Sequence, residues 1–309
     1  MTRILLLLTM TAIALASDYT DFLQQYGKVH SPKRESIFYN NLAFIKAHNL
    51  DDSHTYKLDV NQFADLTFEE FTNFSPITVR NREVAGESPY YVTDPITVDW
   101  RQEGAVTPVK NQGHCGSCWT FSATGAMEGA FFQKTGKLYS LSEQQIVDCD
   151  TAGDGCQGGF ARYGFQYAAK NGIAQEHCYP YTGQDGTCLH NVTNCLVWGI
   201  TDYHSVESST QALEEALLIN PVSVAIYAAG QSFQFYSSGI YNDPECYKDR
   251  DHLDHAVLAV GYCNSETGDY WIVKNSWGES WGDNGYIMMA RGNNMNTCGI
   301  LDQPTYPTF

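Results

Sequence analysis

Two cysteines three positions apart, Cys115 and Cys118, stand in the stretch QGHCGSCWTFS. This spacing suits half of a zinc site, a redox pair, or one structural cysteine beside one nucleophile. A zinc site needs a second pair of ligands at comparable spacing, and the nearest candidates, Cys149 and Cys156, are seven positions apart. The zinc interpretation is therefore disfavoured, and we expect no metal and no other cofactor.

The choice between a redox pair and a nucleophile depends on residues elsewhere in the chain. The N-terminus of a helix lowers the pKa of a thiol, which suits both a redox pair and a nucleophile. No β-α-β pattern precedes the pair, however, and distant cysteines are available to bond Cys115. A nucleophilic thiolate needs a base and a group that orients the base. LDHAVLAVGY supplies His255 and VKNSWGESWG supplies Asn275, so the sequence favours Cys118 as a nucleophile.

The elements that must position these residues differ along the chain. In CWTFSATGAMEGAFF, one helical face carries Trp119, Ala123, Ala126, Met127 and Ala130. This spacing predicts a helix that begins at residue 118, and LSEQQIVDC has a capping-box pattern that predicts a second helix. Beyond about residue 220, short β-rich runs alternate with glycine and asparagine turns. A helical half followed by a β half predicts an α+β protein of two lobes with a cleft between them.

Composition narrows the range of partners. The 309 residues, 43% of them hydrophobic, can bury a large core. The formal net charge of -17 is spread over the chain, which argues against nucleic acid or an anionic membrane as a partner. All ten cysteines lie at or after Cys115, so a boundary precedes the cysteine-rich part.

The N-terminal residues predict entry into the secretory pathway. MTRILLLLTMTAIALAS has a basic Arg3, an apolar run, and small residues at Ala14 and Ala16, as in a secretory signal cleaved after Ala16. The run is shorter than the roughly 20 residues that span a bilayer, so we expect no membrane anchor. The secretory route permits disulfides, and Asn73 and Asn191 stand in candidate glycosylation triplets.

Three blocks, QGHCGSCWTFS, LDHAVLAVGY and NSWGESWGDNGY, resemble in this order the catalytic blocks of the papain-like cysteine proteases. The resemblance implies the two-lobed papain-like fold, with a helical left lobe and a β-barrel-like right lobe. It implies that Cys118 is the nucleophile and His255 the general base, held as a thiolate–imidazolium pair. Asn275 would orient the imidazole beneath Trp277, and Gln112 would stabilise the oxyanion together with the Cys118 backbone N–H.

The resemblance also implies the disulfide pairing. It pairs Cys115 with Cys156, Cys149 with Cys188, and Cys246 with Cys298. Cys178 and Cys195 could form an additional bridge. Cys263 lies where the family commonly has glycine, and we expect it to be a buried, inert thiol.

The segment before the cysteine-rich body resembles the inhibitory prosegment of the family's zymogens, in its cathepsin L-like branch. The residues that match its helical pattern are Arg34, Phe38, Asn41, Ile45 and Asn49. A second matched element consists of Asn61, Phe63 and Asp65. His30 replaces the glutamate that begins the first pattern, and Asp59 replaces the glycine that begins the second.

The same comparison gives the expected domains. They are a signal peptide at 1–16, an inhibitory propeptide at 17–93 and a papain-like peptidase domain at 94–309, with processing between Gly86 and Asp94. We expect acid to release the propeptide by protonating Asp65, Glu69 and Glu70.

A pocket for P2, the second residue before the scissile bond, is also implied. The residues expected to contact substrate are Gly158, Gly159, Phe160, Ala161, Ala225, Leu253, Asp254, Trp277 and Gln303. The pocket's walls are apolar and Gln303 is uncharged. We therefore expect a preference for Leu, Val or Phe, poor acceptance of arginine, and no titration of this preference between about pH 4 and 7.

The chain is thus predicted to be a monomeric endopeptidase zymogen, either secreted or directed to a lysosome or vacuole. Its partners would be protein and peptide substrates and its own propeptide. An open cleft is expected because no insertion that would block it lies between Gly159 and Tyr181. A catalytically silent papain-like binding protein is the alternative. An oxidoreductase is a third possibility, and it predicts a bridge between Cys115 and Cys118.

Overall fold

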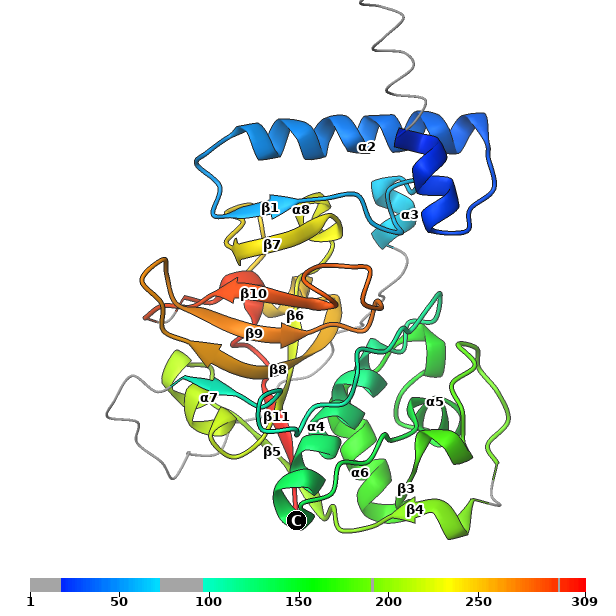
Figure 1. Ribbon diagram of the computed structural model, residues 1–309. Coiled ribbons are helices and arrows are strands. Elements are labelled where there is room, and N and C mark those ends of the chain that lie inside the picture. Colours follow the sequence, from blue (N-terminus) through cyan, green and yellow to red (C-terminus); the bar gives the residue numbers. More distant parts are fainter. Residues whose placement is uncertain (1–17, 73–96, 190–191, 294) are drawn as a thin grey trace, which may run out of the picture.

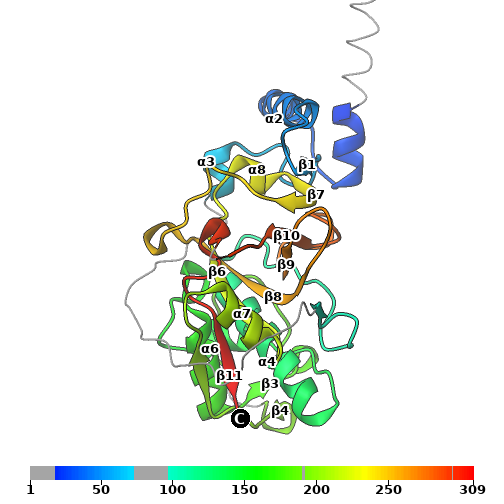
Figure 2. The same cartoon turned by 90° about the vertical axis from the view of Figure 1, so that its left-hand side faces the viewer.

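The structure is a computed structural model that describes residues 18–72, 97–189, 192–293 and 295–309. Figure 1 shows three parts stacked on one another: the N-terminal segment with α2, a lobe built on a sheet, and a helical lobe. The side view in Figure 2 shows the same order, with α2 lying above β1 and β7. The two-lobed α+β architecture expected from the sequence is confirmed.

The helical lobe is built around one long buried helix. Its helices are α4 (Cys118–Thr135), α5 (Glu143–Cys149) and α6 (Ala161–Asn171), with the short turns η1 (Gly155–Gln157), η2 (Glu176–Cys178) and η3 (Thr193–Cys195). Strands β3 (Ile173–Ala174) and β4 (Leu196–Val197) form a separate pair. Helix α4 begins at Cys118, as predicted, and Ser142 caps α5 by accepting a hydrogen bond from the Gln145 N–H at 3.0 Å. The Gln145 side chain instead accepts from the Ala174 N–H at 2.6 Å, so only half of the expected capping box forms.

The second lobe is a single mixed sheet. Its pairing order is β1-β7-β10-β9-β8-β6-β11-β5, with β2 beside β8. The body's strands are β2 (Val98–Asp99), β5 (Asp202–Ser205), β6 (Val222–Ile226), β7 (Tyr236–Tyr241), β8 (His255–Cys263), β9 (Tyr270–Lys274), β10 (Tyr286–Ala290) and β11 (Thr305–Thr308). Its helices are α7 (Thr210–Leu217), α8 (Gln231–Gln234), η4 (Arg250–His252) and η5 (Thr297–Gly299). Among the described strands the pairing runs as an open path from β1 to β5, so the lobe is barrel-like only in part.

The two lobes meet where α4 packs against β8. A Cβ atom at Gly125 would lie 2.7 Å from Leu258 Cδ2, and one at Gly129 would overlap Pro221. Because these glycines are four residues apart, they form one smooth face of α4 that lets the helix approach the sheet. The Ser122 hydroxyl fixes this contact by donating to the Val257 carbonyl at 2.6 Å.

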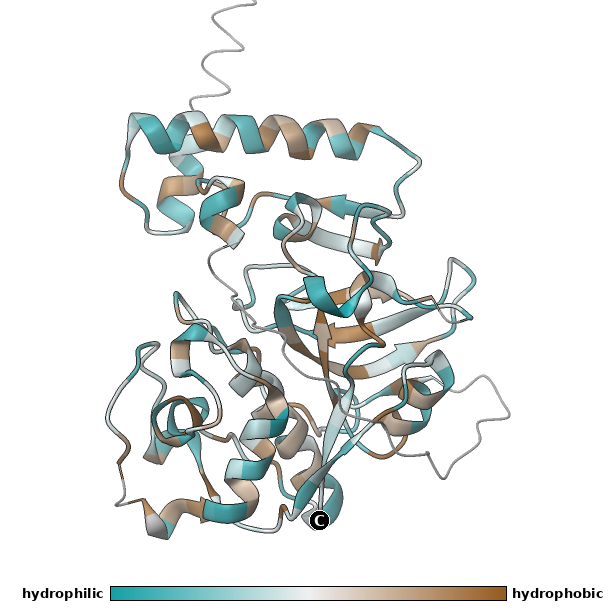
Figure 3. Ribbon diagram, turned by 180° about the vertical axis from the view of Figure 1, so that it is seen from behind, coloured by the Kyte–Doolittle hydropathy of each residue, from teal (hydrophilic) through white to brown (hydrophobic). Residues whose placement is uncertain are grey.

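The N-terminal segment comprises a helix whose described part covers residues 18–25, then α2 (Pro32–Leu50), β1 (Tyr56–Leu58) and α3 (Phe68–Thr72). In Figure 3, hydrophilic and hydrophobic residues alternate along α2. Asn41 Nδ2 donates to the carbonyls of Ala64 and Leu66, both at 2.9 Å. The Asn49 side chain donates to the Leu58 carbonyl at 2.7 Å and accepts from the Leu58 N–H at 3.0 Å. The two asparagines therefore hold the chain after α2 against the helix.

Strand β1 attaches this segment to the body by adding an antiparallel strand to β7. Tyr56 lies opposite Gly239, and a Cβ at Gly239 would lie 2.5 Å from the Thr55 carbonyl oxygen. Thr55 Oγ1 also donates to the Ile240 carbonyl at 2.5 Å. A glycine is thus required on β7 for the close pairing.

Four disulfides cross-link the body. They join Cys115 to Cys156, Cys149 to Cys188, and Cys246 to Cys298, which are the pairs that the family resemblance implied, and Cys178 to Cys195, which was expected as an additional bridge. Cys118 is a free thiol, so the bridge that an oxidoreductase would require is not formed. Cys263 is also free but is partly exposed instead of buried. In the part of the chain that the structure describes, no helix is both long and apolar enough to cross a membrane.

Candidate active site

Three elements bring the candidate catalytic residues together at the seam between the lobes. Cys118 is the first residue of α4, His255 is the first residue of β8, and Asn275 directly follows β9. Strands β8 and β9 are antiparallel neighbours, which places Asn275 beside His255. The Nε2 atom of His255 lies 2.7 Å from Asn275 Oδ1, and this bond requires the hydrogen on Nε2.

Trp277 covers the bond between histidine and asparagine. Its indole ring stacks on the His255 imidazole with ring centres 4.6 Å apart and an interplanar angle of 24°. Trp277 is 2% exposed, and Asn275 is buried beneath it. The stacked indole therefore keeps water from competing for the bond.

Gln112 is tied to the same loop. Its backbone N–H donates to the Ser276 carbonyl at 2.8 Å, and its Oε1 accepts from the Ser276 hydroxyl at 2.7 Å. Its Nε2 donates to the Cys115 carbonyl at 3.0 Å. These bonds fix the amide next to Cys118 and couple it to the asparagine loop. Sequence analysis did not single out Ser276, although it stands inside the NSWG block.

Tyr181 is a further support that sequence analysis missed. Its hydroxyl donates to the Gln112 carbonyl at 2.8 Å and lies 2.6 Å from Ser117 Oγ. It thus joins the residue before Cys118 to the glutamine, across 64 positions of sequence. No local pattern around Tyr181 indicates this contact.

Burial opposes both charges of the expected ion pair in this state of the protein. Cys118 and His255 are each 0% exposed. Burial raises the pKa of the Cys118 thiol to about 12, and burial lowers the pKa of His255 to about 4, against the Asn275 bond that raises it. Burial therefore acts against each charge of the thiolate–imidazolium pair that the resemblance implied.

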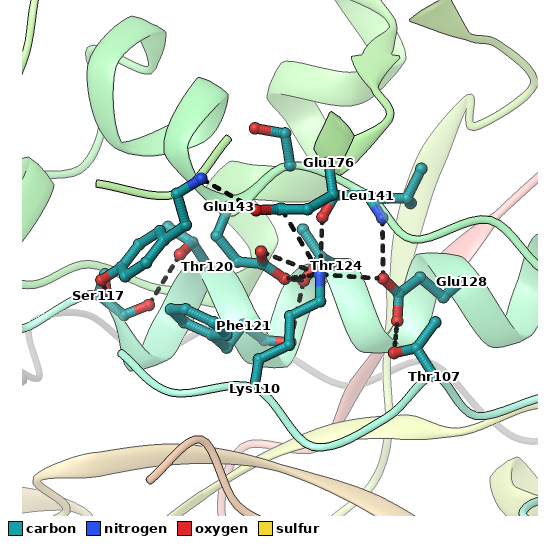
Figure 4. A network of polar contacts seen from close by, with 12 residues as sticks. Thr107, Lys110, Ser117, Thr120, Phe121, Thr124, Glu128, Leu141, Glu143 and Glu176 are labelled. Carbon is teal, nitrogen blue, oxygen red and sulfur yellow. Dashed lines mark hydrogen bonds and ion pairs between the residues drawn. The ribbon is translucent and has the colours of Figure 1, made fainter. Parts of the chain in front are cut away.

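A buried network of charges lies beneath the site (Figure 4). Lys110 Nζ lies 2.7 Å from Glu143 Oε1 and 3.4 Å from Glu128 Oε1. Glu128 on α4 also accepts from Thr107 Oγ1 at 2.6 Å. The network joins the strand-like stretch before Gln112 to α4 and α5. Its members are lysine and glutamate residues that ordinarily indicate an exposed surface, so the sequence alone did not reveal it.

The N-terminal segment packs directly on the indole that covers the site. The rings of Phe63 and Phe71 meet Trp277 edge-on, with centres 5.5 and 5.4 Å away. Gln62 Nε2 donates to the Trp277 carbonyl at 2.7 Å, and Asn61 Nδ2 donates to the Gln234 carbonyl at 2.7 Å. The second expected prosegment element therefore contacts the body where the catalytic residues lie.

The two departures from the prosegment patterns have simple structural explanations. His30 lies before the start of α2, where it faces Glu35 across 4.0 Å. Asp59 stands where the pattern has glycine, and its backbone does not require a glycine because its φ is not positive. Among the described residues only Asn284 and Cys298 combine a side chain with positive φ. Neither departure disturbs the contacts of the segment with the body.

A cavity beside the site contains part of the expected P2 pocket. Phe160, Ala161, Ala225 and Gln303 line it, and so does Ala256, the residue after His255. Gly159 and Arg162 also line it, and sequence analysis had not included Arg162. Leu253 does not line this cavity, contrary to expectation, because its side chain packs against Gly299 instead.

Three other expected contact residues, Gly158, Asp254 and Trp277, also lie outside this cavity. Gly158 is not among its lining residues, and Asp254 is held away from it by the backbone. The Asp254 carboxylate accepts from the N–H groups of Ala228 and Ala229, at 2.7 and 3.0 Å. Burial raises the pKa of Asp254 to about 7 despite these bonds. Asp254 thus braces the chain before His255 and does not form a pocket wall.

Several expectations lie outside the described residues. These are the signal peptide, the processing site between Gly86 and Asp94, and the glycosylation triplets at Asn73 and Asn191.

Comparisons with known proteins agree with this geometry. The papain family cysteine protease domain matches residues 94–308, and the cathepsin propeptide inhibitor domain matches residues 19–71. A cathepsin L-like peptidase of Aedes aegypti is 46% identical over 320 residues, covering 94% of this chain and 92% of the relative. Cathepsin K of Mus musculus is 43% identical, covering 92% and 89%. The solved structure of digestive procathepsin L 3 from Tenebrio molitor larval midgut is 36% identical, with a TM-score of 0.88 over 96% of this chain and 99% of that one.

Proposed function

Because this chain belongs to the papain family of cysteine proteases and carries a cathepsin propeptide, we propose that it cleaves peptide bonds through Cys118, His255 and Asn275, with Gln112 at the oxyanion. The chain is a cysteine endopeptidase zymogen. The observation that best supports these roles is the 2.7 Å bond between His255 and Asn275, held under Trp277 in the lobe seam that also buries the free thiol.

The proposed reaction begins with proton transfer from Cys118 to His255 Nδ1, since the Asn275 bond keeps the hydrogen on Nε2. The thiolate then attacks the substrate carbonyl, and the C–N bond breaks as the imidazolium protonates the leaving amine. Water, with His255 as its base, then hydrolyses the thioester on Cys118, which releases the carboxylic acid and restores the thiol. An amide nitrogen has two N–H bonds. One N–H of Gln112 holds the side chain to the Cys115 carbonyl, and the other would stabilise the oxyanion together with the Cys118 backbone N–H.

Removal of the propeptide would create the reactive ion pair. With the N-terminal segment docked, burial favours the uncharged forms of Cys118 and His255. Opening the cleft would let water reach both groups, which lowers the free energy of the charged forms. The helix start at Cys118 then favours the thiolate.

The roles are tested with Cys118→Ser. A serine hydroxyl is far less acidic and cannot form the ion pair, so we expect a folded, disulfide-bonded protein with almost no peptidase activity. Covalent labelling by a substrate-like electrophile separates this mechanism from a silent binding protein, because only an activated Cys118 would react. Appreciable turnover by Cys118→Ser would refute the mechanism.

We propose that acid weakens the inhibitory segment chiefly by loosening its own fold. Lys28 Nζ lies 2.6 Å from Asp65 Oδ1, and Arg34 bonds Glu70 at 2.5 Å, so these carboxylates pair within the segment and not with the body. The Arg34 bond lowers the pKa of Glu70 to about 2 from 4.5. The stabilisation from Glu70 is therefore complete above about pH 4.5 and is lost as the pH falls toward 2. Equal processing of purified precursor at neutral and acidic pH would contradict the proposal.

The apolar walls of the cavity beside Ala256 support a preference for hydrophobic P2 residues. Cleavage profiling of the activated enzyme with a diverse peptide library tests this preference. We further propose that residues 1–16 direct secretion, that processing occurs between Gly86 and Asp94, and that the enzyme acts as a monomer in a lysosome, a vacuole or the extracellular space. N-terminal sequencing of the processed protein and its mass in solution would test these points.

A further inference from the structure

The cavity that would receive the P2 side chain combines apolar walls with two side chains rich in N–H donors. Phe160, Ala161 and Ala225 supply the apolar walls, and Gln303 and Arg162 also line the cavity. All residues that line this cavity are described, and none of them carries a carboxylate. Ser223 and Thr305 also line the cavity, and their hydroxyls can donate as well as accept. Gln303 and Arg162 add N–H donors to these hydroxyls, so the lining suits a ligand that can accept hydrogen bonds.

Gln303 presents a donor without an acceptor. Its Nε2 atom is buried and has no hydrogen-bond partner among the described residues. The backbone on either side is held in place, since the Asp302 N–H donates to the Gly299 carbonyl at 2.9 Å and the Pro304 carbonyl accepts from the Val206 N–H at 2.9 Å. Because an unpaired buried donor is costly, a ligand oxygen that met Nε2 would be bound preferentially.

Arg162 brings a permanent positive charge to the same cavity. It lies in the first turn of α6, and its guanidinium stacks over the Phe160 ring at 4.0 Å and the Tyr163 ring at 4.8 Å. Stacking uses the faces of the guanidinium, whereas its N–H bonds lie in its plane and point along the edge. The charge opposes a cationic side chain in the cavity and attracts an anion or a carbonyl dipole.

We propose that the P2 pocket accepts glutamine and glutamate in addition to aliphatic and aromatic side chains, with Gln303 and Arg162 as the residues that select them. The two methylenes of either side chain would lie against Phe160, Ala161 and Ala225. The terminal oxygen would accept from Gln303 Nε2, and a carboxylate would also be attracted to Arg162. Arginine and lysine are excluded. The proposal rests on the proposed function, because it needs this cavity to be the P2 pocket of a working peptidase.

The test uses activated enzyme and a substrate series that differs only at P2: Leu, Met, Gln, Glu and Arg. Methionine is the matched control for glutamine, because it has similar length and flexibility without a strong acceptor. At pH 6, where glutamate is ionised, we expect kcat/KM for the Gln substrate within about tenfold of Met. We expect the Glu substrate to exceed the Arg substrate by about tenfold or more, since one carries a complementary charge and the other a like charge.

Two variants assign the selectivity to its residues. Gln303→Leu should lower the ratio of kcat/KM for the Gln substrate to that for the Met substrate, and likewise the ratio of Glu to Met, by about tenfold, because it removes the donor and keeps the volume. Arg162→Met should lower kcat/KM for the Glu substrate relative to the Met substrate. It should raise kcat/KM for the Arg substrate relative to the Met substrate. Lys170→Met is the control, since it removes one exposed positive charge from the same helix outside this cavity, and it should change no ratio.

The proposal is wrong if wild-type enzyme cleaves the Gln and Glu substrates about 100-fold or more slowly than Met. It is equally wrong if Gln303→Leu or Arg162→Met changes all substrates by one common factor. Failure of the proposed function has a different signature: the Leu and Met substrates would themselves not be cleaved, or their cleavage would survive Cys118→Ser.

Discussion

The contact between the N-terminal segment and Trp277 gives a measurable prediction for Phe71→Ala. Phe71 is 3% exposed, and its ring meets both Trp277 and Phe63. Truncating a buried phenylalanine to alanine costs about 3 to 5 kcal/mol. Phe71 contacts Phe63 within the N-terminal segment, and the loss of that contact destabilises the docked and undocked segment alike. We therefore assign only half of the total, about 2 kcal/mol, to the free energy of docking. At 1.4 kcal/mol per factor of ten, the undocked population should rise about 30-fold.

The assay measures how fast the Cys118 thiol of the precursor reacts with an alkylating reagent. Cys118 is fully buried, so its labelling reports opening of the cleft. The experiment is done in a Cys263→Ser background, because Cys263 is the other free cysteine of the described chain and is partly exposed. Intact mass separates labelled precursor from processed protein. Leu50→Ala is the control, since Leu50 is 84% exposed at the end of α2 and should leave the rate unchanged. A rate for Phe71→Ala within about twofold of the parent would refute the reasoning.

The remaining predictions concern the catalytic loop, pH dependence and lobe packing. Asn275→Ala should lower kcat far less than Cys118→Ser, because orientation suffers while nucleophile and base remain; equal losses would show that Asn275 does more than orient. Burial lowers the pKa of His48 on α2, so its protonation favours undocking as the pH falls below about 6.5. His48→Gln should flatten the rise of precursor labelling as the pH falls below about 6.5, and an unchanged profile would exclude His48. Gly125→Ala should lower the melting temperature of the enzyme, because its Cβ would lie 2.7 Å from a methyl of Leu258; an unchanged melting temperature would contradict the packing argument.

The sequence predicted the parts of this protein that depend on local pattern. A helix start at Cys118 follows from the helical spacing of apolar residues, and the strands that begin at His255 and end before Asn275 follow from β-rich runs between turn residues. These patterns lie within a few residues of Cys118, His255 and Asn275, so they can be recognised without knowing which distant residues pack nearby.

What the sequence did not reveal depends on contacts between distant residues. Leu253 was assigned to the pocket from its position in a matched motif and Arg162 was not assigned at all, whereas the pocket lining depends on which way each side chain packs. Arg162 lines the cavity and its guanidinium stacks on Phe160, whereas Leu253 packs against Gly299. The burial that raises the pKa of Cys118 is likewise a result of packing, which a motif does not encode.

The pairing of β1 with β7 also bears on how the mature enzyme behaves in concentrated solution. Strand β7 lies between β1 and β10 in the sheet, so it becomes the outermost strand once the N-terminal segment is gone. An edge strand presents unpaired N–H and C=O groups that can recruit another extended chain. The precursor should therefore be the more colloidally stable form and the better form for storage, and static light scattering of both forms at matched concentration would detect the difference.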